Sequence, residues 1–190
     1  MKQTSFILLL LSCILFCGNR CFSQRQMEYL NRGVYAINEG NGKVFVSWRL
    51  METEGNDVAF NLYRTTDNKT TKLNKAPLLK GTNFVDETVD TNAVNTYFVK
   101  TIIGKKETAT DGSFTLKPHA PVYLSIPLQT PKGYAPNDAS VGDLDGDGQY
   151  EIILHQAGRG KDNSQDGFTD PPIFQAYKLD GTLLWQINLG

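Results

Sequence analysis

The sequence predicts an all-β protein built from two successive groups of short strands. Apolar and polar residues alternate within the runs 44–50, 60–63 and 97–102, and these runs are rich in β-branched and aromatic residues, as half-buried strands are. Turn-forming residues separate the runs, and Asn41-Gly42 is a strong two-residue hairpin signal. No stretch of the sequence keeps a helical period. Together these features favour antiparallel sheets.

The composition is that of an ordinary globular protein. Of the 190 residues, 40% are hydrophobic and 21% are charged, which argues against a disordered tail or a coiled coil. The formal net charge of −1 excludes a nucleic-acid-binding function based on bulk electrostatics. The length suits one domain of usual size and part of a second.

Residues 1–23 are predicted to form a secretory signal peptide. Lys2 gives the segment a positive start, an apolar run covers 6–17, and Cys21 and Ser23 stand three residues and one residue before the expected cut. The apolar run is short for a membrane span, so we expect no span in the mature chain. The predicted location is therefore secreted or periplasmic. A lipoprotein signal is the alternative and would place the protein at the cell surface.

All three cysteines of the chain, Cys13, Cys17 and Cys21, lie within this leader. The mature chain would therefore contain no disulfide and no cysteine-bound metal. An exported domain without disulfides must be stabilised by core burial or by another cross-link, such as a bound metal ion.

Residues 24–117 are predicted to form a β-sandwich, because several short strands follow one another at regular spacing. Trp48, Phe60 and Tyr97 lie on predicted strands and are expected in the core. The order of the strands resembles a fibronectin type III domain. No cysteine pair would cross the sheets, which distinguishes this unit from a disulfide-bonded immunoglobulin domain.

A proline-containing linker is expected at 118–136, and a second unit at 137–190. Such a unit could form the first blade of a β-propeller. A single blade exposes both faces of its sheet and needs neighbours, so the propeller is expected to be truncated, with its remaining blades missing from this chain. The strands expected in this unit are 139–142, 150–156, 173–178 and 183–188.

The most specific chemical motif is the acidic run 143–151. Carboxylates at its first, third and fifth positions can converge on one centre, and Gly148 at the sixth position permits a sharp turn. The seventh and ninth positions can add further oxygen ligands, and hard oxygen ligands in this number suit Ca²⁺. The predicted calcium ligands are Asp143, Asp145, Asp147, Gln149 and Glu151.

An EF-hand begins with a similar run, but it needs a carboxylate at its twelfth position and a helix on each side. Leu154 occupies that position here, and a strand is predicted to follow the run. The sequence therefore predicts a calcium loop at the start of a strand, with a structural role in place of disulfides. The alternative is a polar turn without metal, in which three close aspartates would repel one another.

Several segments resemble the rhamnogalacturonan lyases of polysaccharide lyase family 11. The run 133–148 is very like the start of the family's catalytic propeller, and the resemblance continues at 161–164 and 176–185. Upstream, 26–34 and 46–50 resemble the family's N-terminal β-domain. The junction segment 123–128 also matches.

This resemblance implies a secreted enzyme that cuts the rhamnogalacturonan I backbone of pectin, built on an eight-bladed propeller that holds several calcium ions. The implied reaction is β-elimination, in which a base removes the proton on C5 of galacturonate and the group on C4 leaves. A cation on the neighbouring carboxylate would spread the developing negative charge. The base would be a Lys, Arg, His or Tyr, and the sequence does not identify it.

The sequence departs from the family pattern after the first calcium strand. Many members have Lys-Trp-Asp-Pro there, whereas this chain has 155–160, with His155 and Arg159 as possible replacements for the missing aspartate. Other polar residues are expected on loops that flank the blade, where propellers build their sites. The candidate substrate-binding residues are Asn137, Asp138, His155, Arg159, Lys161, Asp162 and Asn163.

The sequence is compatible with two functions from different classes. The first is a polysaccharide lyase of which this chain is the N-terminal part, expected to be inactive alone. The second is a noncatalytic calcium-binding propeller that serves in adhesion or carbohydrate binding. The resemblance outside the calcium loop favours the lyase.

Overall fold

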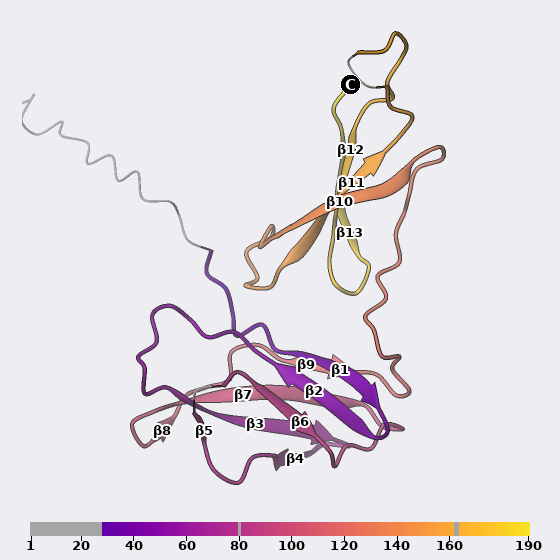
Figure 1. Cartoon of the computed structure of the whole chain (residues 1–190). Coiled ribbons are helices and arrows are strands. Elements are labelled where there is room, and N and C mark those ends of the chain that lie inside the picture. The colour runs from indigo at the N-terminus through magenta and orange to yellow at the C-terminus, as the bar shows by residue number, and fades with distance from the viewer. Residues whose placement is uncertain (1–27, 80, 162–163) are drawn as a thin grey trace, which may run out of the picture.

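The computed structural model describes residues 28–79, 81–161 and 164–190 (Figure 1). Within these ranges all regular elements are strands, so the predicted all-β class is confirmed. None of the described residues belongs to a helix that could cross a membrane. The predicted leader 1–23 lies outside the described residues.

The first domain contains two antiparallel sheets. One sheet has the strand order β1-β2-β6, and the other has the order β4-β3-β7-β8, with β5 paired to β3 and β9 paired to β7. Its strands are β1 (Tyr35–Gly40), β2 (Lys43–Ser47), β3 (Ala59–Thr66), β4 (Lys69–Lys72), β5 (Leu78–Leu79), β6 (Asn83–Asp86), β7 (Asn95–Ile103), β8 (Lys106–Glu107) and β9 (Phe114–Leu116).

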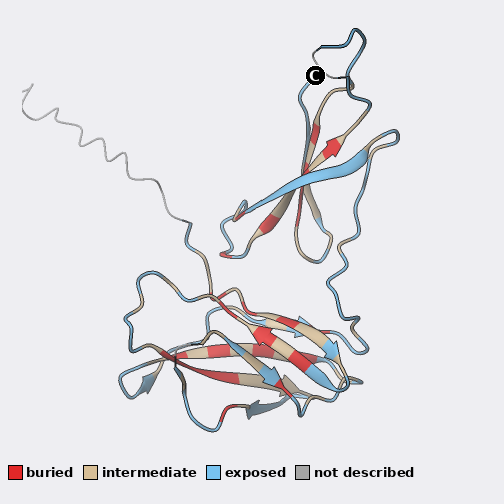
Figure 2. Cartoon of the chain, viewed as in Figure 1, coloured by how far each residue is buried: buried red, intermediate tan, exposed pale blue. Residues whose placement is uncertain are grey.

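A single hydrophobic cluster joins the two sheets of this domain. Val44 and Val46 contribute from β2, and Trp48 follows them. Phe60 and Tyr97 contribute from the other sheet, and the buried positions alternate along the strands as the period of two requires (Figure 2). The predicted core positions of Trp48, Phe60 and Tyr97 are confirmed. The kinship with fibronectin type III domains stays a prediction.

The second domain is one four-stranded antiparallel sheet in which neighbours in sequence are neighbours in space. The expected strands are present, although the first begins at Ala135, inside the expected linker. The strands are β10 (Ala135–Gly142), β11 (Glu151–Ala157), β12 (Ile173–Tyr177) and β13 (Leu183–Asn188).

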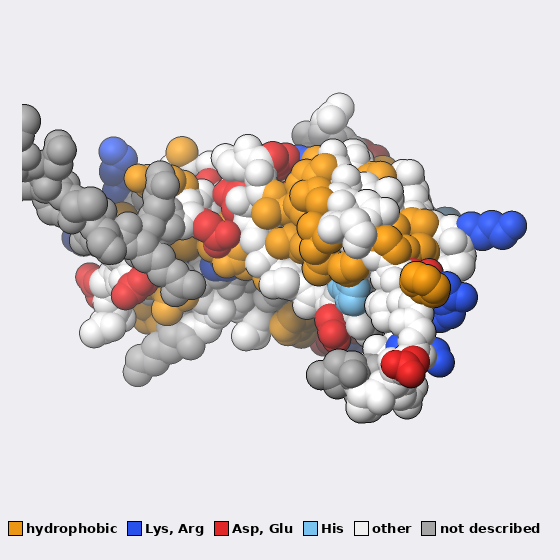
Figure 3. All heavy atoms as spheres, turned by 90° about the horizontal axis from the view of Figure 1, so that it is seen from above, with side chains coloured by type: hydrophobic (Ala, Val, Ile, Leu, Met, Phe, Trp, Pro, Cys, Tyr) orange, Lys and Arg blue, Asp and Glu red, His pale blue; other side chains and the backbone are white. Residues whose placement is uncertain are grey.

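Apolar surface of this second sheet remains exposed. All but the last residue of β10 is exposed (Figure 2), and Val141, Ile187 and Leu189 are among the exposed large apolar residues. The space-filling view shows apolar side chains gathered into a broad area on one face of the molecule (Figure 3). A sheet of this kind suits a blade packed between neighbours, and its membership of a propeller stays a prediction.

Candidate metal centre

The acidic run forms the loop between β10 and β11. The strands meet at the pair Gly142–Glu151, so the loop closes directly on the sheet. A strand therefore lies on each side of the loop, which confirms the sequence argument against an EF-hand.

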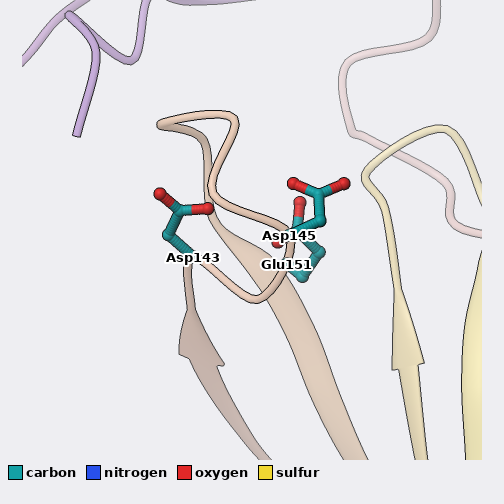
Figure 4. Close-up of side chains that lie close together, drawn as sticks. All are labelled: Asp143, Asp145 and Glu151. Atoms are coloured by element: carbon teal, nitrogen blue, oxygen red, sulfur yellow. The ribbon is translucent and has the colours of Figure 1, made fainter. Parts of the chain in front are cut away.

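Three carboxylates of this region converge. Asp143, Asp145 and Glu151 each offer one oxygen, and these oxygens all lie within 4.8 Å of one another. Asp143 follows the end of β10, and Asp145 and Glu151 lie together across the loop (Figure 4). Glu151 is only 2% exposed, and a buried carboxylate beside two others favours a cation between them. This group could hold a metal ion.

Backbone N–H groups fix the carboxylates in place. The two oxygens of Asp143 accept hydrogen bonds from Gly146 N at 2.8 Å and Gly148 N at 3.1 Å. Glu151 Oε2 accepts one from Leu144 N at 2.8 Å. Gly148 has φ +85°, a left-handed conformation that favours glycine, as predicted for the sharp turn.

A lysine that the motif did not reveal reaches into the loop. Lys178 follows β12, and its Nζ lies 2.5 Å from Asp145 Oδ2 and 3.0 Å from Asp147 Oδ2. Asp147, a predicted ligand, stands outside the converging group of three. Hydrogen bonds from Gln149 N–H and then from Lys178 lower the pKa of Asp147. Hydrogen bonds to Asp145 and Asp147 raise the pKa of Lys178.

The first domain also contacts the loop. Glu28 Oε1 accepts a hydrogen bond from Asp143 N at 3.0 Å, and Asn31 N donates to Gly148 O at 2.8 Å. Arg49 donates to the same carbonyl at 3.2 Å. No local sequence pattern marks these residues, because they lie more than ninety positions away from the loop.

A cleft of about 540 Å³ opens beside the loop, between the two domains. Tyr35, Phe114 and Tyr123 line it from the first domain and the linker. Asp147, Tyr150 and Lys178 line it from the second domain, so both domains contribute aromatic side chains to its wall.

Two candidate substrate-binding residues lie together at the other end of the β10–β11 hairpin. Asn137 Nδ2 is 3.3 Å from His155 Nδ1, and the His155 ring stacks on Phe174 with centroids 5.1 Å apart. Asn137 and Asp138 were expected on a loop but belong to β10, at the register shift between Pro136 and Ala139. The extra residue of a bulge bends the strand without ending the pairing.

The other candidates follow β11. Arg159 pairs with Asp170, which accepts from the Arg159 backbone N–H at 2.7 Å and from Nη2 at 3.4 Å. Lys161 is exposed, and its backbone N–H donates to Thr169 Oγ1 at 3.3 Å. Asp162 and Asn163 lie outside the described residues.

Comparison with known proteins finds relatives for both domains. A family model described as the β-sheet domain of rhamnogalacturonan I lyases matches residues 25–116. Another, described as the C-terminal domain of rhamnogalacturonan lyase family 11, matches 121–190. The chain is 49% identical over 175 residues to the rhamnogalacturonan endolyase YesW of Bacillus subtilis, covering 87% of this chain and 27% of that protein. It is 41% identical over 179 residues to the exolyase YesX of the same organism, covering 88% and 28%.

Solved structures give the same result. The crystal structure of YesW aligns with a TM-score of 0.75 at 46% identity, covering 87% of this chain and 29% of that one. A family 11 rhamnogalacturonan lyase of Bacillus licheniformis aligns with a TM-score of 0.75 at 50% identity, with the same coverage. The chain spans between a quarter and a third of the length of these relatives. It belongs to the rhamnogalacturonan lyases of family 11.

Proposed function

We propose that the protein to which this chain belongs is an exported lyase that cleaves the rhamnogalacturonan I backbone of pectin. The observation that carries this proposal is the 49% identity over 175 residues to an endolyase, which extends through both domains and the linker. A noncatalytic calcium module would share the acidic loop without sharing the first domain and the junction.

The proposed chemistry is β-elimination. A base takes the C5 proton of a galacturonate, the electron pair forms the C4–C5 double bond, and the oxygen on C4 leaves with its sugar. The chain spans about a quarter of its curated relatives, so we propose that these 190 residues alone do not complete the catalytic cleft.

We propose that this chain contacts the substrate at the end of the second sheet that lies away from the acidic loop. Asn137 and His155 contact each other there, and Arg159 and Lys161 follow the same strand. Cationic side chains suit the galacturonate carboxylate. Asp138, Asp162 and Asn163 complete the proposed set.

The proposed cation of the acidic loop is calcium. The donors are carboxylate oxygens, which Ca²⁺ prefers. Asp143, Asp145 and Glu151 would hold it, with Asp147 and the Gln149 carbonyl as further proposed ligands. Bound there, calcium supplies positive charge that ties the loop to the start of β11, and we assign it no part in the elimination.

The lyase proposal is tested with the complete gene product on rhamnogalacturonan I. Ultraviolet absorbance of the unsaturated uronate is expected to rise, and the isolated 190-residue chain is expected to give no rise. Chromatography of the products separates internal cutting from release at chain ends. A folded complete protein that produces no unsaturated uronate would contradict the proposal.

The calcium proposal is tested by calorimetry on chelator-treated protein. Asp145→Asn is expected to weaken calcium binding by about tenfold or more, since it removes one charged ligand. Asp67→Asn, in an exposed turn of the first domain, is the matched control and is expected to bind as the parent does. Absence of binding heat in the parent would refute the calcium assignment.

The proposed location is outside the cytoplasm. N-terminal sequencing of exported protein is expected to begin at Gln24, directly after the predicted leader. A lipid-modified cysteine at the N-terminus would instead establish the lipoprotein alternative.

A further inference from the structure

The Arg49 side chain of the first domain lies against the acidic loop of the second domain. Its Nη1 donates to Gly148 O at 3.2 Å and to Asn31 O at 3.1 Å. Its Cζ lies 4.4 Å from the centre of the Tyr150 ring, within the range of a cation–π contact. The Arg49 side chain therefore contacts two residues of the loop and also the arm, which is the segment 28–34 that precedes β1.

The space for this guanidinium is narrow. A Cβ atom placed on Gly33 would lie 2.6 Å from Arg49 Cζ, and Gly33 has φ +53°. The side chain thus occupies a gap between Gly33 and the Tyr150 ring that a flat, stacking cation fits. Lysine keeps the charge but lacks the planar guanidinium that stacks on the Tyr150 ring.

The loop residues that Arg49 contacts lie within three positions of Glu151, a carboxylate of the converging group. Gly148 and Tyr150 precede Glu151 in the chain, and the Gly148 N–H also donates to Asp143. Asn31 N holds the same Gly148 carbonyl from the arm. Fixing the peptide at Gly148 therefore fixes the geometry in which the carboxylates meet.

We propose that Arg49 is a positioning residue for the acidic loop, through which cation binding and docking of the two domains stabilise each other. This inference rests on the proposed function, because the cation is the one proposed for the loop. Linkage requires the effect to be reciprocal: if docking raises the cation affinity, the cation must favour docking by the same factor.

The first test measures calcium affinity by calorimetry on the full chain, using Arg49→Met, Arg49→Lys and the control Lys43→Met. Lys43 lies in the same domain in an exposed ion pair with Glu87. Arg49→Met is expected to weaken calcium binding about tenfold, within the usual range of coupling between sites. Arg49→Lys is expected to lie between this variant and the parent, and Lys43→Met to match the parent.

The second test measures the distance between the domains with spin labels. The chain has cysteines only at 13, 17 and 21, so the leaderless protein accepts labels at Glu52→Cys and Thr182→Cys, two exposed positions in different domains. Calcium is expected to narrow the distance distribution in the parent. In Arg49→Met the distribution is expected to stay broad at the same degree of calcium saturation.

The outcomes separate the two proposals. No calcium binding by the parent would refute both the calcium assignment and this inference. Calcium binding by the parent with unchanged affinity in Arg49→Met would refute the inference alone, even if that variant melts earlier, because a purely structural arginine alters stability without altering affinity. If calcium leaves the distance distribution of the parent unchanged, the proposed coupling between cation binding and domain docking is also wrong.

Discussion

The side-chain amide of Gln156 donates to Oε1 of Gln175 at 2.7 Å, and neither residue has exposed surface. Gln175 Oε1 also accepts from the Tyr177 hydroxyl at 2.8 Å, and Gln175 Nε2 donates to Gln129 O and to Gln186 Oε1 at 2.8 Å each. Gln156 Oε1, by contrast, has no hydrogen-bond partner. Two neighbouring glutamines of the same sheet therefore differ in how completely they are satisfied.

This difference predicts unequal costs for the same substitution. Gln175→Met removes the acceptor shared by the buried Gln156 amide and the buried Tyr177 hydroxyl and is expected to lower the free energy of unfolding by about 2–4 kcal/mol. Gln156→Met removes an unsatisfied oxygen together with two hydrogen bonds, to Gln175 and to Thr130, and is expected to cost about 1 kcal/mol or less. Urea unfolding followed by Trp185 fluorescence, in a Trp48→Phe background, measures both. Equal losses would contradict the assigned network.

The two glycines of the acidic loop give a matched pair of variants. Gly146 and Gly148 have φ +79° and +85°, so alanine at either is expected to cost about 1–2 kcal/mol of backbone strain. A Cβ on Gly148 would lie 2.7 Å from Asn31 N, whereas one on Gly146 has nothing within 4 Å.

Gly148→Ala is therefore expected to destabilise the full chain by about 1–3 kcal/mol more than Gly146→Ala, because the added methyl group separates the loop from the arm. Thermal unfolding in the presence of a chelator measures the difference without a contribution from metal. Indistinguishable melting temperatures would show that the contact between the loop and Asn31 does not exist in solution.

The loop motif could be predicted from sequence because its carboxylates lie within nine residues of one another and its glycine requirement is local. The strand pattern was equally local, yet β2 ends at Ser47 although the alternation continues to Leu50. Beyond Ser47 the backbone turns to other partners: Trp48 N donates to Thr82 O, and Arg49 N donates to Arg32 O. The alternation of apolar and polar residues indicates which side chains are buried, but it does not indicate where the hydrogen bonding between strands ends.

Long-range contacts could not be predicted in the same way. Arg49 and Lys178 are distant from the loop in the sequence and contact it only in the folded protein. A single lysine after a strand belongs to no motif with a defined spacing. Asn137 and Asp138 have turn-forming side chains, which favoured a loop, but the ladder to β11 resumes at Ala139 and keeps them in β10. Tertiary pairing outweighed local preference there.

The stability of the first domain is expected to depend on pH through the ion pair between buried Arg32 and half-buried Glu54. Glu54 accepts two hydrogen bonds from Arg32, at 2.7 and 2.8 Å, and hydrogen bonding to Arg32 lowers the pKa of Glu54 from its ordinary 4.5. The folded state therefore binds this proton more weakly than the unfolded state. The stability that results is complete above pH 4.5 and is lost as the pH falls through the lowered pKa.

Glu54→Gln is expected to flatten the stability profile below pH 5 and to cost about 2–3 kcal/mol at neutral pH, because Arg32 stays buried without its counter-charge. Glu87→Gln, in an exposed pair, is expected to leave the profile almost unchanged. Urea midpoints across this pH range give both curves. A Glu54→Gln profile parallel to that of the parent would contradict the role of the pair.

Substitution of Lys178 is expected to change the calcium affinity in the opposite direction from Asp145→Asn. The Lys178 ammonium group contacts Asp145 and Asp147, so it occupies oxygens that are proposed for calcium and competes with the ion. Lys178→Met is therefore expected to tighten calcium binding by roughly two- to fivefold, the range set by an exposed ion pair. The same variant is expected to lower the melting temperature of the chelator-treated protein, because the carboxylates then repel one another without a counter-charge. Calorimetry and thermal unfolding of the full chain measure the two effects, with Lys132→Met, an exposed linker position, as the control. Weaker binding in Lys178→Met would show that the lysine supports the metal site, and the assignment of Lys178 as a competitor would then be wrong.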